Sequence, residues 1–151
     1  MTIASAQTLC AFKPVEPFQP RTRENGMTFG LGPAGYDVRI AERVELHPGQ
    51  FRLASTIERF NMPAELMGIV HDKSTLARRG LSVFNTVIEP GWRGILTLEL
   101  KNQGGQPIVI PAGSPIAQVV FHLLDEPTDL PYEGKYQDQE AGPQGPRFDP
   151  G

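Results

Sequence analysis

Hydroxyl, guanidinium and carboxylate side chains gather between Lys73 and Lys101, at spacings that suit a hydrolytic site. Ser74 and Arg78 are four residues apart, so on a helical turn both side chains lie on one face. The free N–H groups at the start of that turn, with Lys73 beside them, form an anion site. The alternative is an ordinary surface turn whose arginines are solvated, because exposed charges are usually hydrated.

Carboxylates follow in the same segment. Leucines at 96, 98 and 100 alternate with Thr97 and Glu99, which predicts a strand on which Glu99 points away from the leucines. Glu99 is useful for chemistry if that second face borders a pocket, whereas on an outer strand it is simply hydrated. Glu89 precedes Pro90-Gly91 in a predicted hairpin over 88–94, so it is either a second carboxylate of the site or a turn residue.

This set of groups can activate a water molecule for attack on carbon or phosphorus beside a bound phosphate chain. The residue types by themselves leave open which of the two atoms is attacked. Histidines at 47, 71 and 122 lack metal-ligand spacing, and a single cysteine, Cys10, excludes a multi-cysteine zinc site or an internal disulfide. Ser74 has no histidine in a triad signature, which argues against a nucleophilic serine.

The rest of the chain predicts one all-β domain that positions these groups. A length of 151 residues suits a single domain with a real core, and 16 glycines with 15 prolines suit short strands joined by turns. With one short helix at 74–79, the pattern predicts a barrel or a sandwich. The expected strands are 36–40, 43–46, 50–54, 56–60, 66–71, 96–100, 107–110 and 116–124.

Charge and cysteine usage limit the partners and the compartment. The net charge of −3 argues against a general nucleic-acid binder, which would carry a basic field. No segment has the length and apolarity of a signal peptide or a membrane span. The single cysteine favours a reducing compartment, so we expect a cytoplasmic protein with no nucleic-acid and no membrane partner.

Composition divides the chain into three parts. Prolines at 14, 17 and 20 make residues 1–26 an extended N-terminal arm, and residues 27–126 form the β-barrel domain. Residues 127–151 hold five prolines and four glycines, and they contain too few apolar side chains to form a core of their own. Because Tyr132, Lys135 and Tyr136 suit stacking and phosphate contact, this tail is either a lid over a ligand or a disordered terminus.

An ordered series of motifs adds a resemblance to these patterns. The sequence resembles the dCTP deaminase branch of the dCTP deaminase/dUTPase superfamily, with a match that runs from about residue 28 to 147. No single stretch is specific, but their order is. The stretches are 34–39 (Ala-Gly-Tyr-Asp-Val-Arg), 53–58 with 62–64, 73–81 (Lys-Ser-Thr-Leu-Ala-Arg-Arg-Gly-Leu), 89–100, 113–121 and 134–137.

The resemblance implies a distorted dUTPase-like β-barrel that assembles as a homotrimer with sites between subunits. It implies metal-independent hydrolysis of dCTP to dUTP and ammonia, with water attacking C4 of cytosine. Many nucleobase deaminases use zinc held by His and Cys, and this chain lacks such a ligand set. Mg²⁺ would accompany the triphosphate of the deoxycytidine nucleotide instead of performing the chemistry.

Roles carried over from the resemblance fall on individual residues. Glu99 would be the general acid and base, while Ser74 and Arg78 would shape and polarise the site and contact phosphate or water. Gln118 would lie near the triphosphate, and the tail would close over it. The full nucleotide-binding set is Lys73, Ser74, Thr75, Arg78, Glu89, Gln118, Tyr132, Lys135, Tyr136 and Gln139.

Departures from the family pattern keep two alternatives open. The run Val83–Ile88 is shorter than in the family and lacks its usual histidine and alanine, and Glu89 stands where an aspartate is usual. In the dUTPase branch that aspartate prepares the water that attacks the α-phosphate, and an extra methylene can misplace a water. The alternatives are a pyrophosphatase acting on dUTP or another dNTP, alone or as a second activity, and a catalytically silent nucleotide-binding trimer.

Overall fold

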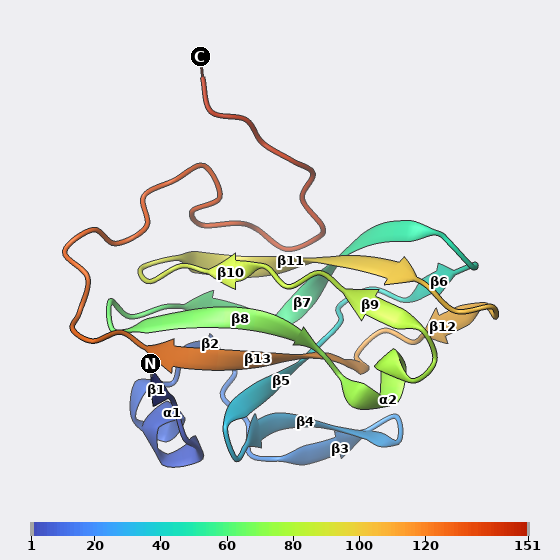
Figure 1. The fold of residues 1–151 in the computed structure, drawn as a ribbon, viewed down its shortest axis with the longest axis horizontal. Coiled ribbons are helices and arrows are strands. Elements are labelled where there is room, and N and C mark those ends of the chain that lie inside the picture. Colours follow the sequence, from blue (N-terminus) through green and yellow to red (C-terminus); the bar gives the residue numbers. More distant parts are fainter. Residues whose placement is uncertain (1, 151) are drawn as a thin grey trace.

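Two β-sheets and a short ribbon curl around one core to form a distorted barrel, which confirms the predicted all-β class (Figure 1). The computed structural model describes residues 2–150. The larger sheet has the order β10-β8-β13-β5-β4-β3 with β1 beside β13, the second has the order β2-β7-β11-β9, and β12 pairs with β6. The strands are β1 (Thr2–Ile3), β2 (Val15–Glu16), β3 (Thr22–Glu24), β4 (Met27–Gly32), β5 (Gly35–Arg39), β6 (Val44–Leu46), β7 (Phe51–Asn61), β8 (Leu66–Asp72), β9 (Leu81–Val83), β10 (Val87–Ile88), β11 (Arg93–Asn102), β12 (Ile108–Ile110) and β13 (Pro115–Leu123).

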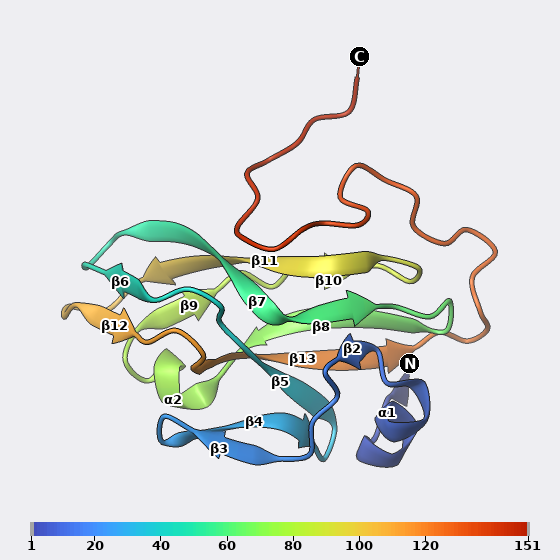
Figure 2. The ribbon, with the colours of Figure 1, turned by 180° about the vertical axis from the view of Figure 1, so that it is seen from behind.

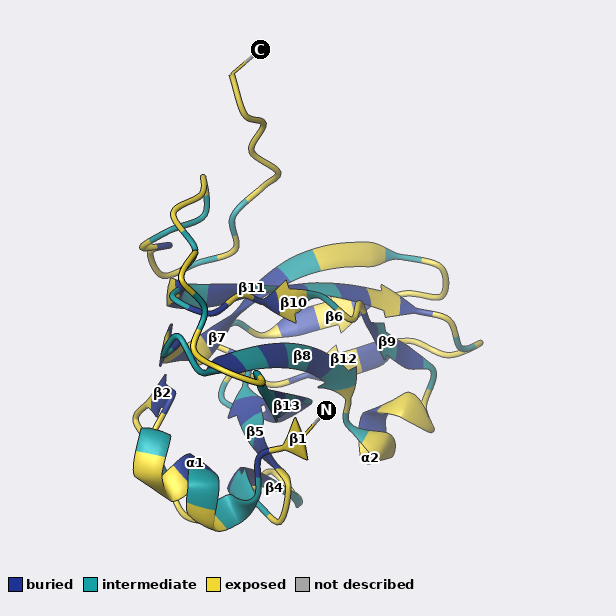
Figure 3. Cartoon of the chain, turned by 60° about the vertical axis from the view of Figure 1, so that its left-hand side comes forward, coloured by how far each residue is buried: buried dark blue, intermediate teal, exposed yellow. Residues whose placement is uncertain are grey.

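The core is built from the alternating apolar faces of the central strands. Leu98 and Leu100 of β11 are buried, as are Val119 and Phe121 of β13, because residues two apart on a strand share a face. Figure 3 shows the buried residues concentrated on the barrel strands, whereas the outer side of helix α1 and most of the C-terminal tail are exposed or half-buried. The alternation that predicted the β11 strand therefore also sets which of its side chains face away from the core.

Strand β7 is a single long strand where the sequence predicted separate strands at 50–54 and 56–60. It pairs antiparallel with β11 on both sides of an irregular point and curves strongly across the barrel (Figure 2). The strand continues through this point because the Thr56 hydroxyl accepts a hydrogen bond from the backbone N–H of Leu96, which the regular ladder leaves unpaired. One strand thereby spans the whole wall next to the candidate site.

The turn over 88–94 is present, but the predicted hairpin is wrong. The N–H of Trp92 donates to the carbonyl of Glu89 at 3.1 Å, which closes the turn. The strands on its two sides belong to different sheets, since β10 pairs with β8 and β11 pairs with β7 and β9. A Pro-Gly signal fixes a reversal of the chain and says nothing about which strands pair afterwards.

The structure contains a second helix besides the predicted one. Helix α1 (Ala6–Phe12) lies in the expected N-terminal arm, with Ser5 as its N-cap accepting from the N–H of Thr8 at 3.4 Å. Strands β1 and β2 of the same segment pair with β13 and β7. The helix was missed because three prolines follow it closely, although Ser5 is an ordinary capping signal.

Helix α2 (Ser74–Ala77) forms within the short helix predicted at 74–79. Lys73 is its N-cap and makes no side-chain capping bond, and Ser74 is the first helical residue. Gly80 follows with φ +95°, a conformation that favours glycine. A Cβ at Gly80 would lie 2.5 Å from the backbone nitrogen of Gly104, so the turn after the helix requires a residue without a Cβ at this position.

We predict that Gly80→Ala lowers the free energy of unfolding by about 2 kcal/mol. The alanine would have to adopt a left-handed backbone conformation, and its Cβ would clash with the backbone of Gly104. Gly105→Ala is the matched control, since a Cβ there would meet nothing within 4 Å. Urea unfolding followed by circular dichroism measures both variants. Equal losses in the two variants would contradict this account of the turn.

Candidate functional site

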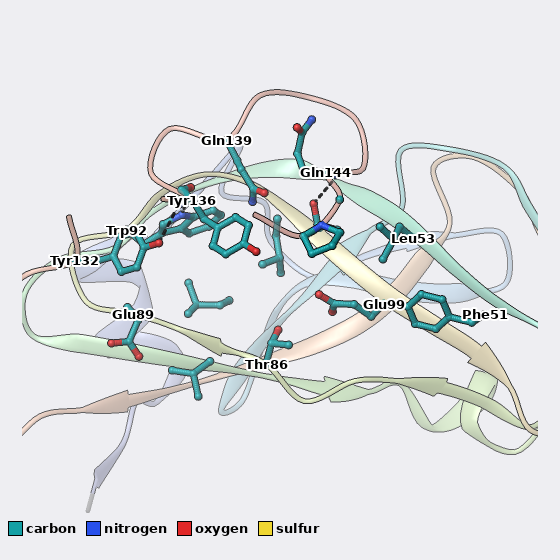
Figure 4. A pocket seen from close by; sticks show the side chains of 16 residues that line it. Phe51, Leu53, Thr86, Glu89, Trp92, Glu99, Tyr132, Tyr136, Gln139 and Gln144 are labelled. Carbon is teal, nitrogen blue, oxygen red and sulfur yellow. Dashed lines mark hydrogen bonds between the residues drawn. The ribbon is translucent and has the colours of Figure 1, made fainter. Parts of the chain in front are cut away.

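A cavity of about 510 Å³ opens between the wall formed by β7 and β11, the β10 segment and the C-terminal tail (Figure 4). Polar groups from β11, the β10 segment and the tail reach it among mostly apolar neighbours, a composition typical of small-molecule sites. Its lining residues are Phe51, Leu53, Thr86, Val87, Ile88, Glu89, Trp92, Leu96, Thr97, Glu99, Tyr132, Tyr136, Gln139, Gln144, Gly145 and Pro146.

Glu99 is the carboxylate that this cavity partly removes from water. It pairs with Leu53 in the β7–β11 ladder and lies on the face opposite Leu98 and Leu100, as the alternation predicted. That second face borders the cavity, which is the condition the sequence left open. Burial raises the pKa of the Glu99 carboxyl above its ordinary 4.5, and a hydrogen bond to its own backbone opposes this only in part. A carboxyl with a raised pKa is suited to both accepting and returning a proton.

Glu89 also lines the cavity, in a different environment from Glu99. Figure 4 shows Glu89 below Trp92 and Tyr132, whereas Glu99 lies at the other end beside Leu53. Glu89 is exposed, so water screens its charge. The cavity therefore has one half-buried and one exposed carboxylate.

The C-terminal tail forms one wall of the cavity through bonds to the start of β11. The indole Nε1–H of Trp92 donates to the carbonyl of Tyr136 at 2.6 Å. The N–H of Ile95 donates to the carbonyl of Gln139 at 2.9 Å, and the Gln139 amide returns a bond to the Ile95 carbonyl at 3.2 Å. The N–H of Tyr132 donates to the carbonyl of Pro90 at 2.8 Å. The tail thus lies against its own barrel, with both tyrosines facing the cavity.

Lys73 and the residues of α2 belong to a second cluster outside the lining of this cavity. Lys73 Nζ donates to the carboxylate of Asp37 at 2.5 Å, and Gln118 lies directly opposite Asp37 in the β13–β5 ladder. Ser74 and Arg78 are exposed on α2, and Thr75 is exposed beside them. This cluster offers a cation, hydroxyls and an amide, which are groups that suit phosphate oxygens.

The structure therefore divides the expected site residues. Glu89, Glu99, Tyr132, Tyr136 and Gln139 come together at the cavity. Lys73, Ser74, Thr75, Arg78 and Gln118 lie elsewhere on the same chain, and Lys135 pairs with Asp149 at 2.8 Å.

Sequence reasoning missed several residues that line the cavity, among them Thr97, Leu53 and Trp92. Thr97 shares its strand face with Glu99, and its hydroxyl accepts from the N–H of Gln144 at 3.1 Å. Leu53 could have been found only from the pairing of β7 with β11, which no local pattern gives. Trp92 could have been singled out, because a tryptophan in a turn usually has a packing or binding reason to be there.

Residues 2–150 contain no cluster of three or more His, Cys, Asp or Glu side chains that could hold a metal ion. Within the same residues, none of the helices has the length and apolarity needed to cross a membrane.

An ion pair fastens the tail beside the cavity. The Arg93 guanidinium donates two bonds to the Asp138 carboxylate, at 2.9 and 3.0 Å, and Arg59 lies 3.6 Å from it. Asp138 has φ +58°, a backbone conformation that costs a non-glycine residue energy. The Arg93 bonds hold the pKa of the Asp138 carboxyl below its ordinary 3.8.

We predict that Asp138→Asn loosens the tail and increases cleavage between 132 and 147 in limited proteolysis, because the Arg93 pair is lost. Asp129→Asn, an exposed position in the same tail, is the control. In the unsubstituted protein a lowered carboxyl pKa means that the pair is intact at neutral pH. It is lost only as the pH falls through that lowered pKa, below 3.8. Equal cleavage of both variants would rule out this fastening.

Comparison with known proteins places the chain in a family. Residues 35–124 match the family described as dCTP deaminase-like. A "dCTP deaminase, dUMP-forming" of Corynebacterium glutamicum strain R is 40% identical over 113 residues, covering 73% of this chain and 60% of the relative. A dCTP deaminase of Acidobacterium capsulatum is 32% identical over 160 residues, covering 84% of this chain and 87% of the relative. The chain thus spans about 60% of the length of the Corynebacterium relative.

Solved structures agree on the fold. Native EIAV dUTPase superposes with a TM-score of 0.60 at 20% identity, covering 81% of this chain and 98% of the dUTPase. A mutant dUTPase from phage phi11 of S. aureus, in which a structural Mg(II) ion is coordinated, gives a TM-score of 0.59 at 19% identity, covering 80% and 96%. At such identities the likeness shows the dUTPase-like fold alone. The family match and the sequence relatives carry the assignment, and the chain belongs to the dCTP deaminase-like family.

Proposed function

We propose that this chain deaminates dCTP to dUTP and ammonia. The observation that carries the proposal is Glu99, a half-buried carboxylate with a raised pKa in the wall of a cavity large enough for a nucleoside. Its surroundings suit a base, because Trp92 and Tyr136 offer aromatic faces and Thr97 and Gln139 offer polar groups. Relatives named dCTP deaminase support the choice of substrate.

The chemistry needs one group that can move two protons in turn. Glu99 takes a proton from water as the water oxygen bonds to C4 of cytosine, and delivers that proton to N3 of the ring. It then moves the proton of the new C4 hydroxyl to the amino nitrogen, the C4–N bond breaks, and ammonia leaves a C4 carbonyl. A carboxyl whose pKa is raised towards neutrality performs both transfers more readily than a fully solvated one.

A homotrimer with sites between subunits would unite the two clusters that one chain keeps apart. In this arrangement Ser74 of the partner subunit and Arg78 of the partner subunit would polarise the water and contact phosphate at the Glu99 cavity. Lys73, Thr75 and Gln118 would bind the triphosphate from the same side as α2. Support comes from the separation itself, since the acid beside the cationic cluster, Asp37, is already paired with Lys73, whereas no Lys or Arg is among the described residues that line the Glu99 cavity.

The tail would close over the nucleotide, with Tyr132, Tyr136 and Gln139 on the base side and Lys135 towards the phosphates. Mg²⁺ would travel with the triphosphate, because phosphate oxygens are among the hard ligands that it prefers. We place the protein in the cytoplasm on the grounds of its single cysteine, and we expect no nucleic-acid partner for a chain of net charge −3. The arm of 1–26, the barrel of 27–126 and the tail of 127–151 remain our proposed division of the chain.

A second activity is favoured by one observation. Glu89 lines the same cavity as Glu99 with an exposed carboxylate, where it could orient a water towards a phosphate. The Corynebacterium relative is named dUMP-forming, which is the product expected if pyrophosphate is also released. Pyrophosphatase activity at Glu89 is therefore the second candidate, alongside deamination or in place of it.

We predict that Glu99→Gln reduces kcat for ammonia release from dCTP by at least about 100-fold while leaving nucleotide binding within about twofold, because it keeps the shape and removes the proton acceptor. Glu89→Gln is the matched control: it should preserve ammonia release and, if the second activity exists, abolish release of pyrophosphate. Products from dCTP, dCMP and dUTP with magnesium are resolved by chromatography. A fully active Glu99→Gln would refute the assignment of Glu99, and binding without turnover by the unsubstituted protein would favour a silent nucleotide-binding trimer.

We also predict where kcat falls on the acidic side of its pH dependence. Glu99 must be ionised to accept the first proton, and burial raises its pKa, so activity should rise with pH through a midpoint above 4.5. Steady-state rates of ammonia release measure this midpoint. A limb at or below 4.5 would mean that Glu99 is not the base.

A further inference from the structure

The cavity wall contains a change of register between β7 and β11. Ile95 pairs with Arg59, whereas Thr97, two residues later, pairs with Ser55, four residues earlier on β7. β7 therefore carries a bulge of two extra residues opposite Leu96. Bulges of this kind re-aim side chains and are common next to sites.

One hydroxyl serves the backbone groups at this bulge. Thr56 is 2% exposed, and its Oγ1 accepts from the N–H of Leu96 at 3.2 Å. The same Oγ1 donates to the carbonyl of Glu58 at 2.8 Å. A single side chain thus replaces the ladder bonds that the register change removes, and a buried N–H and a buried carbonyl depend on it.

Neighbouring side chains tie the bulge to residues 39–42. Glu58, fully buried, accepts from the backbone N–H and from Nε of Arg39, both at 2.9 Å. The N–H of Ser55 donates to the Glu42 carboxylate at 2.8 Å. These bonds hold both ends of the bulge, and the Thr56 hydroxyl links it to β11.

The bulge lies between the two halves of the cavity. Trp92 and Gln139 belong to the half beside residues 93–95, whereas Leu53 and Glu99 belong to the half beyond Thr97 (Figure 4). Residues 93–95 and Glu99 lie on one strand, so the bulge sets which residue of β7 stands beside Glu99, and that residue is Leu53. Two residues of strand correspond to about 6.6 Å, so loss of the bulge would slide residues 51–55 along β11 and move Leu53 away from Glu99.

We propose that Thr56 is a positioning residue, whose buried hydroxyl fixes the register that places Leu53 beside the Glu99 carboxylate and so sets how far that carboxylate is removed from water. It touches neither substrate nor reacting atoms and acts through the Leu96 backbone. This role in turnover rests on the proposed deamination, whereas the effect on the surroundings of Glu99 does not.

The test compares Thr56→Val, which keeps shape but removes the hydroxyl, with Thr56→Ser, which keeps the hydroxyl. Valine should lower kcat for ammonia release by about 10- to 100-fold with KM within about twofold, since a displacement near 1 Å costs about this much. Serine should stay within about threefold of the unsubstituted protein. Thr56→Ala leaves room for a water at the bulge, and it provides the same comparison if valine prevents folding.

A titration of the Glu99 carboxyl by NMR, identified with Glu99→Gln, gives a readout that needs no turnover. Thr56→Val should move the Glu99 pKa from its raised value towards 4.5, and Thr56→Ser should leave it in place. Ser114→Ala removes another fully buried hydroxyl, which accepts a hydrogen bond from the Asn25 amide at 2.9 Å and is not among the residues that line the cavity. This variant should change stability without changing either kcat or the Glu99 titration.

Different failures point to different parts of the argument. If the unsubstituted protein releases no ammonia, the proposed deamination fails, while the titration still decides the positioning role. An unchanged Glu99 titration in a folded Thr56→Val or Thr56→Ala overturns the positioning role. The positioning role is also overturned if Ser114→Ala, at the same loss of stability as the Thr56 variant, shows the same loss of kcat.

Discussion

The pairing of β7 with β11 is the interaction on which the rest of the site depends. One face of this ladder closes the core with Leu98 and Leu100, and the other presents Glu99 and Thr97 to the cavity. The ladder is interrupted at one point, where buried polar side chains replace backbone pairing. A fully satisfied polar group in a core is tolerated, whereas a half-satisfied one is costly, so this stretch of sequence has little freedom.

The first residues of β11 bind the C-terminal tail and also pair with β7. Gly94 has φ +148°, and a Cβ there would lie 2.7 Å from the backbone nitrogen of Gln139, so only a glycine lets the two segments meet. The Arg93–Asp138 pair and the amide bonds of Gln137 and Gln139 add to this contact. A segment too poor in apolar residues to form a core acquires a defined place because a strand edge offers it partners.

The two clusters of chemical groups differ in solvation, which explains what each can do. Glu99 is half-buried, so its proton affinity is raised and it suits proton transfer. Ser74 and Arg78 are exposed on a short turn, where a cation keeps its charge and can meet phosphate. No Lys or Arg is among the described residues that line the Glu99 cavity, and the acid of the second cluster, Asp37, is paired with Lys73.

Sequence alone determined the local features: the β11 strand, the outward direction of Glu99, the helical turn at 74–77 and the reversal at Pro90-Gly91. Each of these depends on periodicity or on turn chemistry within a few residues, which a linear pattern records. Only the tertiary structure decided that β10 pairs with β8, that Thr56 bridges to Leu96 and that Ser74 lies apart from Glu99 in one chain. These depend on contacts between residues distant in sequence, and one local pattern is compatible with many such pairings.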